Sequence, residues 1–534
     1  MIVLRKAKQK RLALAISMAL AGGAVYANFP PQLELSDLNG TNGFVINGAN
    51  TYEDSGTSVS SAGDINGDGI NDLIIGAPYA TNPADFSGSS YVVFGSDQNL
   101  PNPLNLSTLD GSNGFVINGS SDYEYSGTSV SAAGDINGDG IDDLIIGAPG
   151  AFPNGYYSGA SYVVFGSDQP WAGSLDLSSL DGSNGFVING VAEYDESGTS
   201  VSTAGDINGD GFDDLIIGAP FATVDYSYAG VSYVVFGSDQ PWAGTLNLSA
   251  INGSNGFVIN GVGQGDDLGA SVSNAGDINN DGFDDVIIGA ADADTNGTYA
   301  GASYVVFGSD QGFPNPLNLS GLDGSNGFVI NGVSADDEAG TSVSTAGDIN
   351  TDGIDDLIVG ASLADPNGLI SSGASYVVFG SGQPWASSLN LSALNGSNGF
   401  VINGVSAGDN SGASVSTAGD INGDGIDDLL TGAPLANANG IDSGASYVVF
   451  GSDQAWASSF DLSGLNGSNG FVINGVSAGD YSGTSLSTAG DINGDGFDDL
   501  ITGAPFVGTS GASYVVYGAG QTQNDDVIFA DSFE

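Results

Sequence analysis

Seven short loops of the sequence carry oxygen side chains at a regular spacing that is typical of a bound hard cation. Each loop reads Asp-x-Asn-x-Asp-Gly-x-[Asn/Asp]-Asp, and the first begins at Asp64. Side-chain oxygens at positions 1, 3, 5 and 9 and the backbone carbonyl of position 7 can surround such a cation, and Gly at position 6 permits the sharp turn. No nitrogen or sulfur ligand is present, which argues against zinc or copper, and Mg²⁺ demands a stricter octahedron. The loops therefore predict about seven Ca²⁺ sites.

The predicted calcium ligands are the residues at positions 1, 3, 5, 7 and 9 of every loop: Asp64, Asn66, Asp68, Ile70, Asp72, Asp135, Asn137, Asp139, Ile141, Asp143, Asp206, Asn208, Asp210, Phe212, Asp214, Asp277, Asn279, Asp281, Phe283, Asp285, Asp348, Asn350, Asp352, Ile354, Asp356, Asp420, Asn422, Asp424, Ile426, Asp428, Asp491, Asn493, Asp495, Phe497 and Asp499. An EF-hand would place a glutamate at position 12, where the first loop has Ile75, and would need flanking helices. The alternative is that Asp-Gly and Asn-Gly simply form hairpin turns. Three carboxylates per loop repel one another without a cation among them, so their repetition favours a metal site.

The charges are distributed very unevenly along the chain. Of 534 residues, 63 are Asp or Glu and 5 are Lys or Arg, and there is no His or Cys. All five basic residues precede residue 12, ahead of an apolar run over 12–25 and a small-residue site that ends at Ala27. This order predicts a signal peptide over 1–27, with an apolar run too short for a membrane span. We therefore expect a secreted or cell-surface protein, extracellular or periplasmic, without a membrane span after cleavage.

This composition excludes several classes of function. A chain from residue 28 onward without a basic side chain cannot neutralise phosphates, so nucleic acid is not an expected partner. Salt bridges and disulfides are impossible there, and catalysis through His, Cys or Lys is excluded. Paired carboxylates leave a carbohydrate-active enzyme as a remote alternative, but most close Asp pairs belong to the calcium loops. We therefore expect no enzymatic activity.

The loops belong to a longer internal repeat. The phrase Asp-Ile-Asn recurs every 71 or 72 residues, and each unit contains four short β-branched or aromatic runs between turn residues. In the first unit these lie around Val59, over 73–75, over 91–94 and over 115–117. Seven such units predict an all-β fold, a seven-bladed β-propeller of four-stranded antiparallel blades over 28–519. A β-solenoid is the alternative, but its coils are usually shorter.

The two ends of the repeat predict how the ring closes. A spare Gly-Phe-Val-Ile-Asn-Gly run over 43–48 precedes the first unit, and the seventh unit stops after 514–517 without one. We predict that this N-terminal strand, over 44–46, joins the last blade, built by residues 482–517, and removes an exposed edge. Residues 520–534 then form an acidic C-terminal tail.

The units resemble FG-GAP repeats, the blades of the integrin α-subunit β-propeller, over residues 35–518. The Gly-Ala-Pro part of that motif stands at 76–78, 147–149, 218–220, 432–434 and 503–505, and its Phe-Gly part is replaced, as by Ser55-Gly56. Integrin-like propellers carry the calcium loop on only some blades, whereas every unit here has it. The resemblance implies a propeller with bound calcium, and it points to cell adhesion.

Loop variation suggests where a partner binds. The calcium loops and the long connectors after the third strand are expected on one face, and the loops that differ most between units on the other. That second face carries a set of aromatic residues in the first three units: Tyr52, Tyr79, Phe86, Tyr123, Tyr125, Phe152, Tyr156, Tyr157, Tyr194, Phe221, Tyr226 and Tyr228. Exposed tyrosines suit protein or carbohydrate contacts. We therefore predict an adhesion or ligand-binding module for an extracellular protein or glycan. A structural component of a surface layer and neutral variation of the loops are the alternatives.

Four tryptophans stand at the same position of the repeat, in the connectors of the second, third, fifth and sixth units. They are Trp171, Trp242, Trp385 and Trp456. A tryptophan at a repeated position is more typical of packing than of ligand binding, so each is expected to hold its connector onto its own blade.

Overall fold

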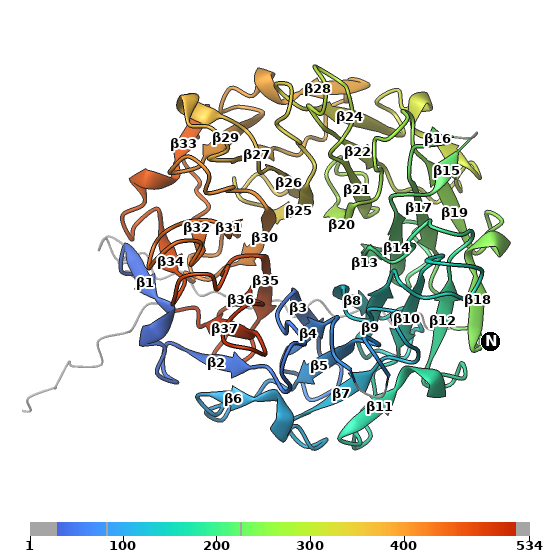
Figure 1. Cartoon of the computed structure of the whole chain (residues 1–534). Helices are drawn as coiled ribbons and strands as arrows, with labels where there is room; N and C mark the ends of the chain where they lie inside the picture. Colours follow the sequence, from blue (N-terminus) through green and yellow to red (C-terminus); the bar gives the residue numbers. More distant parts are fainter. Residues whose placement is uncertain (1–28, 82–83, 225–226, 520–534) are drawn as a thin grey trace, which may run out of the picture.

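Seven β-sheets surround a central channel in the computed structural model, which describes residues 29–519 apart from 82–83 and 225–226. Each sheet runs from the channel to the outer rim (Figure 1). The prediction of a seven-bladed all-β propeller is confirmed. The predicted signal peptide, the acidic tail and Tyr226 lie outside the described residues.

Each sheet holds four antiparallel strands, as predicted, and a short fifth strand at the rim. The strands next to the channel are β3 (Ser58–Gly63), β8 (Ser129–Gly134), β13 (Ser200–Gly205), β20 (Ser271–Gly276), β25 (Ser342–Gly347), β30 (Ser414–Gly419) and β35 (Ser485–Gly490). The second strands are β4 (Asp72–Ala77), β9 (Asp143–Ala148), β14 (Asp214–Ala219), β21 (Asp285–Ala290), β26 (Asp356–Ala361), β31 (Asp428–Ala433) and β36 (Asp499–Ala504). The third strands are β5 (Ser89–Val93), β10 (Ala160–Val164), β17 (Val231–Val235), β22 (Ala302–Val306), β27 (Ala374–Val378), β32 (Ala445–Val449) and β37 (Ala512–Val516). The fourth strands are β7 (Gly114–Asn118), β12 (Gly185–Asn189), β19 (Gly256–Asn260), β24 (Gly327–Asn331), β29 (Gly399–Asn403), β34 (Gly470–Asn474) and β2 (Gly43–Asn47).

The fifth strand of each blade comes from the connector of the next unit and runs parallel to the fourth strand. These rim strands are β11 (Ser174–Asp176), β18 (Thr245–Asn247), β23 (Leu317–Asn318), β28 (Ser388–Asn390), β33 (Ser459–Asp461), β1 (Gln32–Glu34) and β6 (Leu104–Asn105). In the first blade, Ser174 of β11 pairs with Val116 of β7, 58 residues earlier in the chain. The connectors therefore cover the outer edges that four-stranded blades would leave exposed.

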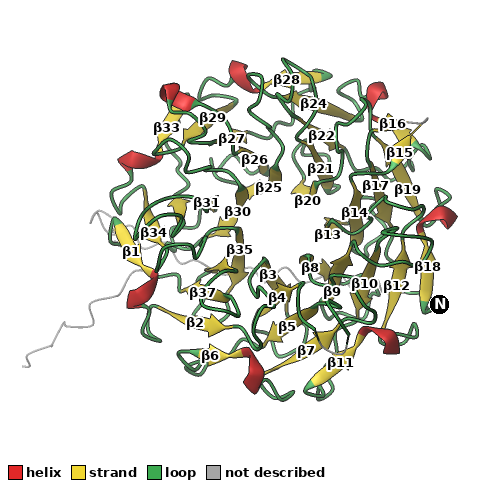
Figure 2. Ribbon diagram, viewed as in Figure 1, coloured by secondary structure: helices red, strands yellow, loops and turns green. Residues whose placement is uncertain are grey.

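Short 3₁₀ turns and one small hairpin lie at the rim and in the loops. Three-residue 3₁₀ turns follow the rim strands, and one more lies in a loop of the fifth blade (Figure 2). They are η1 (Leu35–Asp37), η2 (Leu106–Thr108), η3 (Leu177–Ser179), η4 (Leu248–Ala250), η5 (Leu319–Gly321), η6 (Pro366–Gly368), η7 (Leu391–Ala393) and η8 (Leu462–Gly464). A small hairpin of β15 (Thr223–Val224) and β16 (Ser227–Tyr228) lies in the third blade. Within the described ranges, no helix is long and apolar enough to cross a membrane.

The core lies between neighbouring blades because each sheet buries both of its faces. All six residues of β4 are buried, which explains why its run over 73–77 is apolar and does not alternate with polar residues. Ile74 packs with residues of the second blade, whereas Leu73 and Ile75 pack on the other side with residues of the seventh blade. Seven such interblade clusters make the ring continuous.

The N-terminal segment closes the ring in two places. Strand β2 pairs antiparallel with β37, which confirms the predicted completion of the last blade. Strand β1 pairs parallel with β34 of the sixth blade, as the rim strand of any other connector does. The blue N-terminal strands therefore lie beside the red C-terminal ones in Figure 1. Residues 29–47 therefore supply the seventh unit with the rim strand of its connector as well as its fourth strand.

The tryptophans pack as expected, but onto the preceding blade. The indole of Trp171, in the connector of the second unit, stacks on Phe115 of the first blade with ring centroids 4.2 Å apart. The other three tryptophans repeat this arrangement on Phe186, Phe328 and Phe400. The reason is the rim strand, since a connector that pairs with the previous blade also brings its aromatic residue there. Phe313 and Phe29 take the same place in the connectors of units four and seven.

Truncating a buried side chain of β2, which closes the ring, should destabilise the protein as much as truncating the equivalent side chain of β7, which lies within the first blade. Phe44 and Phe115 are both fully buried, so Phe44→Ala and Phe115→Ala should each lower the free energy of unfolding in urea by about 3–5 kcal/mol. Val45→Ala, at a half-buried site of the same strand, is the matched control and should have a much smaller effect. A Phe44→Ala variant as stable as the wild type would contradict closure by β2.

Candidate metal loops and the opposite loop face

Each predicted calcium loop is wound around its own side-chain oxygens. In the first blade the loop joins β3 to β4, and the Asp64 carboxylate accepts the backbone N–H groups of Asp68 at 2.9 Å and Gly69 at 2.8 Å. The Asn66 side-chain oxygen also accepts the N–H of Asp68, at 3.0 Å. Gly69 has a φ of +91°, a left-handed conformation that explains the glycine at position 6. The loop is therefore held open around positions 1, 3 and 5.

The carboxylate at position 9 has a different environment, because it begins a buried strand. Asp72 is 0% exposed and accepts the N–H groups of Gly95 at 2.8 Å and Ile65 at 3.2 Å. The side-chain amide of Asn66 also donates to it, at 3.1 Å. Position 9 therefore ties the loop to the end of the third strand of its own blade.

Burial changes the acidity of this carboxyl. It raises the pKa of Asp72 to about 8, and the nearby charges of Asp68 and Asp64 act in the same direction. The position 9 carboxyls of the other loops are equally buried and have pKa values raised by the same leading cause: Asp143, Asp214, Asp285, Asp356, Asp428 and Asp499. Without a bound cation these carboxyls therefore stay protonated near neutral pH, since the ring has no basic side chain that would favour their charged form.

Position 8 has a role that the sequence reasoning missed, because it links neighbouring blades. Asp142 of the second loop accepts the backbone N–H of Asp64 in the first loop at 2.8 Å. The same bond, at 2.8–2.9 Å, is made by Asp213, Asp284, Asp355, Asp427 and Asp498. At the junction of the last and first blades, Asn71 takes this place and accepts from Asp491 at 3.3 Å. The sequence does show that position 8 is Asp or Asn in every unit. Its regular spacing alone, however, does not reveal that this side chain contacts the next unit.

The donor chemistry of the loops fits a hard divalent cation. All predicted side-chain ligands are carboxylates or amides. In the sixth loop, the buried side-chain oxygen of Asn422 has no hydrogen-bond partner within the described chain, as expected of an oxygen reserved for another ligand. No three acidic side chains of the described residues lie close enough together to hold a metal unaided, since position 9 turns towards the strand ends. Calcium binding therefore stays a prediction.

The opposite face brings most of the predicted aromatic residues together, in two groups. Tyr79 and Phe86, from the loop between β4 and β5, contact Tyr123 and Tyr125, from the loop before β8, with ring centroids 5.7–6.3 Å apart. One blade further on, the second group repeats the arrangement with Phe152, Tyr156, Tyr157 and Tyr194. Together these eight residues form what we call the aromatic arc.

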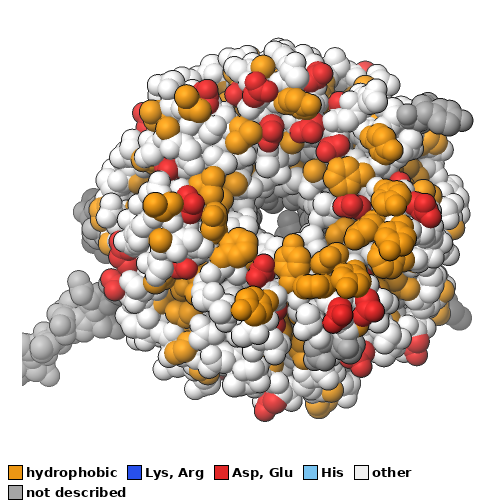
Figure 3. Space-filling model, in the orientation of Figure 1, with side chains coloured by type: hydrophobic (Ala, Val, Ile, Leu, Met, Phe, Trp, Pro, Cys, Tyr) orange, Lys and Arg blue, Asp and Glu red, His pale blue; other side chains and the backbone are white. Residues whose placement is uncertain are grey.

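The aromatic arc is continuous and open to solvent. Tyr157 lies near enough to Tyr125 to contribute, after burial, to raising the Tyr125 pKa, so the two groups adjoin. Tyr156 is 61% exposed and Tyr194 is 56% exposed. Figure 3 shows hydrophobic side chains gathered on one side of the channel, over the second and third blades. Tyr52 is 74% exposed but makes no ring contact within the described chain, so it stands outside the arc.

A family model described as the FG-GAP repeat matches seven segments of the chain. They are residues 55–93, 126–164, 197–235, 268–306, 339–378, 411–449 and 482–516. Each segment spans the first three strands of one blade, including its predicted calcium loop.

Curated relatives share these repeats over part of their length. The chain is 33% identical over 204 residues to phosphatidylinositol-glycan-specific phospholipase D of Bos taurus, which covers 38% of this chain and 23% of the relative. It is 27% identical over 356 residues to the protein of the same name from Dictyostelium discoideum, covering 61% and 34%. Integrin alpha-5 of Xenopus laevis is 28% identical over 260 residues, covering 47% and 21%. The chain thus spans about a fifth to a third of the length of these relatives.

These relatives correct the expectation of no enzymatic activity. Several of them bear the name of an enzyme, a phospholipase D. That expectation rests on the absence of His and Cys and of Lys beyond residue 10, and on the assignment of most close carboxylates to calcium. Such an inventory does not show which activities accompany the repeats in related proteins.

The raised pKa values predict how stability depends on pH when calcium is removed. The folded chain keeps protons on the position 9 carboxyls that the unfolded chain releases near pH 4, so their stabilising effect is lost as the pH rises towards 8. In EDTA, the melting temperature should therefore fall as the pH rises from 5 to 8. Each group should lower the free energy of unfolding by at most about 1.4 kcal/mol per pH unit. Asp72→Asn removes one such group and should make the decline shallower. A melting temperature in EDTA that rises over this range would contradict the assignment.

Proposed function

The chain belongs to the FG-GAP repeat family, and on that premise we propose that it is a secreted or cell-surface β-propeller that binds calcium and adheres to an extracellular protein or glycan. Calcium occupies the seven loops on one face and stabilises the ring. The aromatic arc on the other face contacts the ligand. The resemblance to integrin α subunits supports adhesion as the setting for this contact.

The uncompensated charge of the loops supports calcium as the stabilising ligand. Positions 1 and 5 of each loop place carboxylates near the buried position 9 carboxyl, and the ring offers no basic side chain. Bound Ca²⁺ supplies the missing positive charge. The chain's own part is to hold Asp64, Asn66 and Asp68 in place through backbone N–H donors.

Removal of calcium should destabilise the whole ring. At a calcium concentration ten times the dissociation constant, each site adds about 1.4 kcal/mol, so seven sites add on the order of 10 kcal/mol. We expect EDTA to lower the melting temperature by about 10 °C or more, measured by differential scanning calorimetry. Isothermal titration should find about seven sites, and one fewer in Asp68→Ala. Asp85→Ala, at an exposed carboxylate of the opposite face, is the matched control. A melting temperature unchanged by EDTA would overturn the proposal for calcium.

The aromatic arc is the observation that carries the proposed ligand contact. Tyrosines combine a large apolar area with a polar hydroxyl, and they lose little conformational freedom on binding. Solvent-facing residues with no packing role would have no reason to cluster, yet the arc joins loops of successive blades by ring contacts.

Loss of tyrosines from the arc should weaken binding without unfolding the ring. We expect the combined change Tyr123→Ala and Tyr156→Ala to reduce binding at least tenfold to the matrix proteins or glycans that wild type retains on an array in millimolar calcium. Tyr299→Ala is the matched control, because Tyr299 is 47% exposed in the corresponding loop of the fourth blade but stands outside the arc. Equal binding by the double variant and wild type would refute a role for the arc.

A further inference from the structure

The exposed hydrophobic side chains of the ring are confined to one face. Within the described residues, every large hydrophobic side chain that is exposed lies in a loop of the face that carries the aromatic arc. Beyond the arc, smaller groups of hydrophobic side chains continue around the channel (Figure 3). Exposed apolar residues scattered singly need no explanation, but the confinement of all of them to one face indicates a contact surface.

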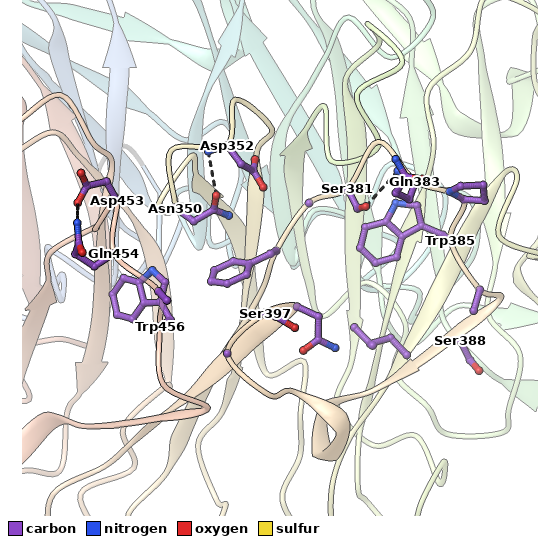
Figure 4. Close-up of a pocket in the computed structure, with 18 residues that line it drawn as sticks. Asn350, Asp352, Ser381, Gln383, Trp385, Ser388, Ser397, Asp453, Gln454 and Trp456 are labelled. Atoms are coloured by element: carbon purple, nitrogen blue, oxygen red, sulfur yellow. Dashed lines mark hydrogen bonds between the residues drawn. The ribbon is translucent and has the colours of Figure 1, made fainter.

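The face of the metal loops has a different character. Between the fifth and sixth blades it is hollowed by a cavity of about 480 Å³, with Trp385 and Trp456 on either side (Figure 4). Both indoles stack on phenylalanines of the preceding blades, and the carboxylate of Asp453 accepts a hydrogen bond from Gln454 at 2.6 Å. These groups are occupied by contacts within the chain, unlike the exposed residues of the opposite face.

Every blade contributes to the apolar face through the same loop, which joins its second strand to its third. Six of these loops are nearly equal in length, so the repeat places them at similar heights above the ring. Each loop carries an exposed large hydrophobic residue, and we call this set the apolar crown: Phe86, Tyr156, Tyr228, Tyr299, Ile370, Ile441 and Phe506. Five of the seven lie outside the aromatic arc, so the crown belongs to the whole ring.

The crown residues of the later blades are held by their backbone and not by side-chain packing. The carbonyl oxygen of Ile370 accepts the N–H of Gly408 at 2.9 Å, and that of Ile441 accepts the N–H of Gly479 at 2.9 Å. The two isoleucines are nevertheless 72% and 75% exposed. The chain therefore fixes the position of apolar side chains that it does not itself bury.

Backbone conformation gives a second, independent observation on the crown. Phe86 and Tyr299 have φ values of +50° and +54°, left-handed conformations that are unfavourable for bulky residues. In the sixth unit the same loop position holds Asp442, at +55°, a residue type that tolerates this conformation better. Because both aromatic side chains are exposed, packing within the ring does little to compensate for the strain. Such strain at an exposed site points to a role outside the fold.

The shape and the charge of this face restrict what can cover it. The crown surrounds the channel, whereas a single peptide or glycan chain would contact only one sector of it. Carboxylates lie in the same loops, such as Asp292 and Asp294 in the fourth blade and Asp365 in the fifth, and the ring has no basic side chain. A second copy of this face would therefore oppose like charges, and anionic lipids would be repelled.

We propose that the apolar crown docks on a neutral lipid surface with choline head groups. The crown residues enter the boundary between head groups and acyl chains, a depth that favours tyrosine. Choline cations bind over the faces of the tyrosine rings and beside the carboxylates of the same loops. This contact goes beyond the proposed function, because it depends on crown residues outside the aromatic arc.

Flotation with vesicles tests this proposal directly. Large unilamellar vesicles of phosphatidylcholine serve as the probe, and vesicles with one fifth phosphatidylglycerol serve as the anionic comparison, both in millimolar CaCl₂. We expect the protein to float with the neutral vesicles and to bind the anionic ones more weakly. Failure to float with neutral vesicles at millimolar lipid, or stronger binding to the anionic ones, overturns the proposal.

Substitutions outside the aromatic arc separate lipid docking from the ligand contact. The combined change Tyr299→Ser, Ile370→Ser and Ile441→Ser should lower the partition coefficient for neutral vesicles by about tenfold or more. The melting temperature should not change, because all three side chains are exposed. The combined change Tyr299→Phe, Ile370→Leu and Ile441→Leu is the matched control, which keeps the apolar surface and should partition like wild type.

Two outcomes with these variants would contradict lipid docking. One is a serine variant that partitions like wild type. The other is a dimer, seen by sedimentation velocity without vesicles and lost in the serine variant, which would assign the crown to a second copy of the chain. Binding through the arc on the protein and glycan array should be unaffected in both variants, so a failure of the proposed function is recognised separately.

Discussion

The fold depends on how a ring without basic side chains accommodates its buried carboxylates. Each blade begins its second strand with a fully buried aspartate, of which Asp72 is the first, and the hydrogen bonds that this carboxyl accepts within the described residues come from N–H donors. Two more carboxylates of the same loop repel it. The loops are thus both the turns that shape every blade and the places where charge accumulates. On this account, divalent cations complete the electrostatic balance that Lys and Arg provide elsewhere.

The second constraint is that every sheet buries both faces, so no blade is stable without its neighbours. The ring meets this constraint through several links at each junction, among them rim strands such as β11 at the outside and position 8 aspartates such as Asp142 in the loops. The junction of the last and first blades keeps the rim link but has Asn71 at position 8. Constant loops on one face and divergent loops on the other follow from this division between structural and exposed roles.

Much of the fold could be predicted from the sequence because the repeat is long and its phase is strict. The spacing of Asp64 and its equivalents predicts the number of blades, and the spare run over 43–48 predicts the closing strand. Contacts between units are harder to predict from the sequence. The rim strand Ser174–Asp176 is too short and polar to be recognised, and without it the stacking of Trp171 on the preceding blade cannot be foreseen. The spacing indicates position 9 only as a ligand, although Asp72 also joins its loop to the end of a strand.

A crystal structure of the chain grown in millimolar CaCl₂, with anomalous differences collected at long wavelength, tests the central claim most directly. The account predicts an anomalous peak in each of the seven loops, surrounded by the oxygens of positions 1, 3 and 5. Loops that remain without such peaks in an intact ring would show that the buried carboxylates are balanced in some other way.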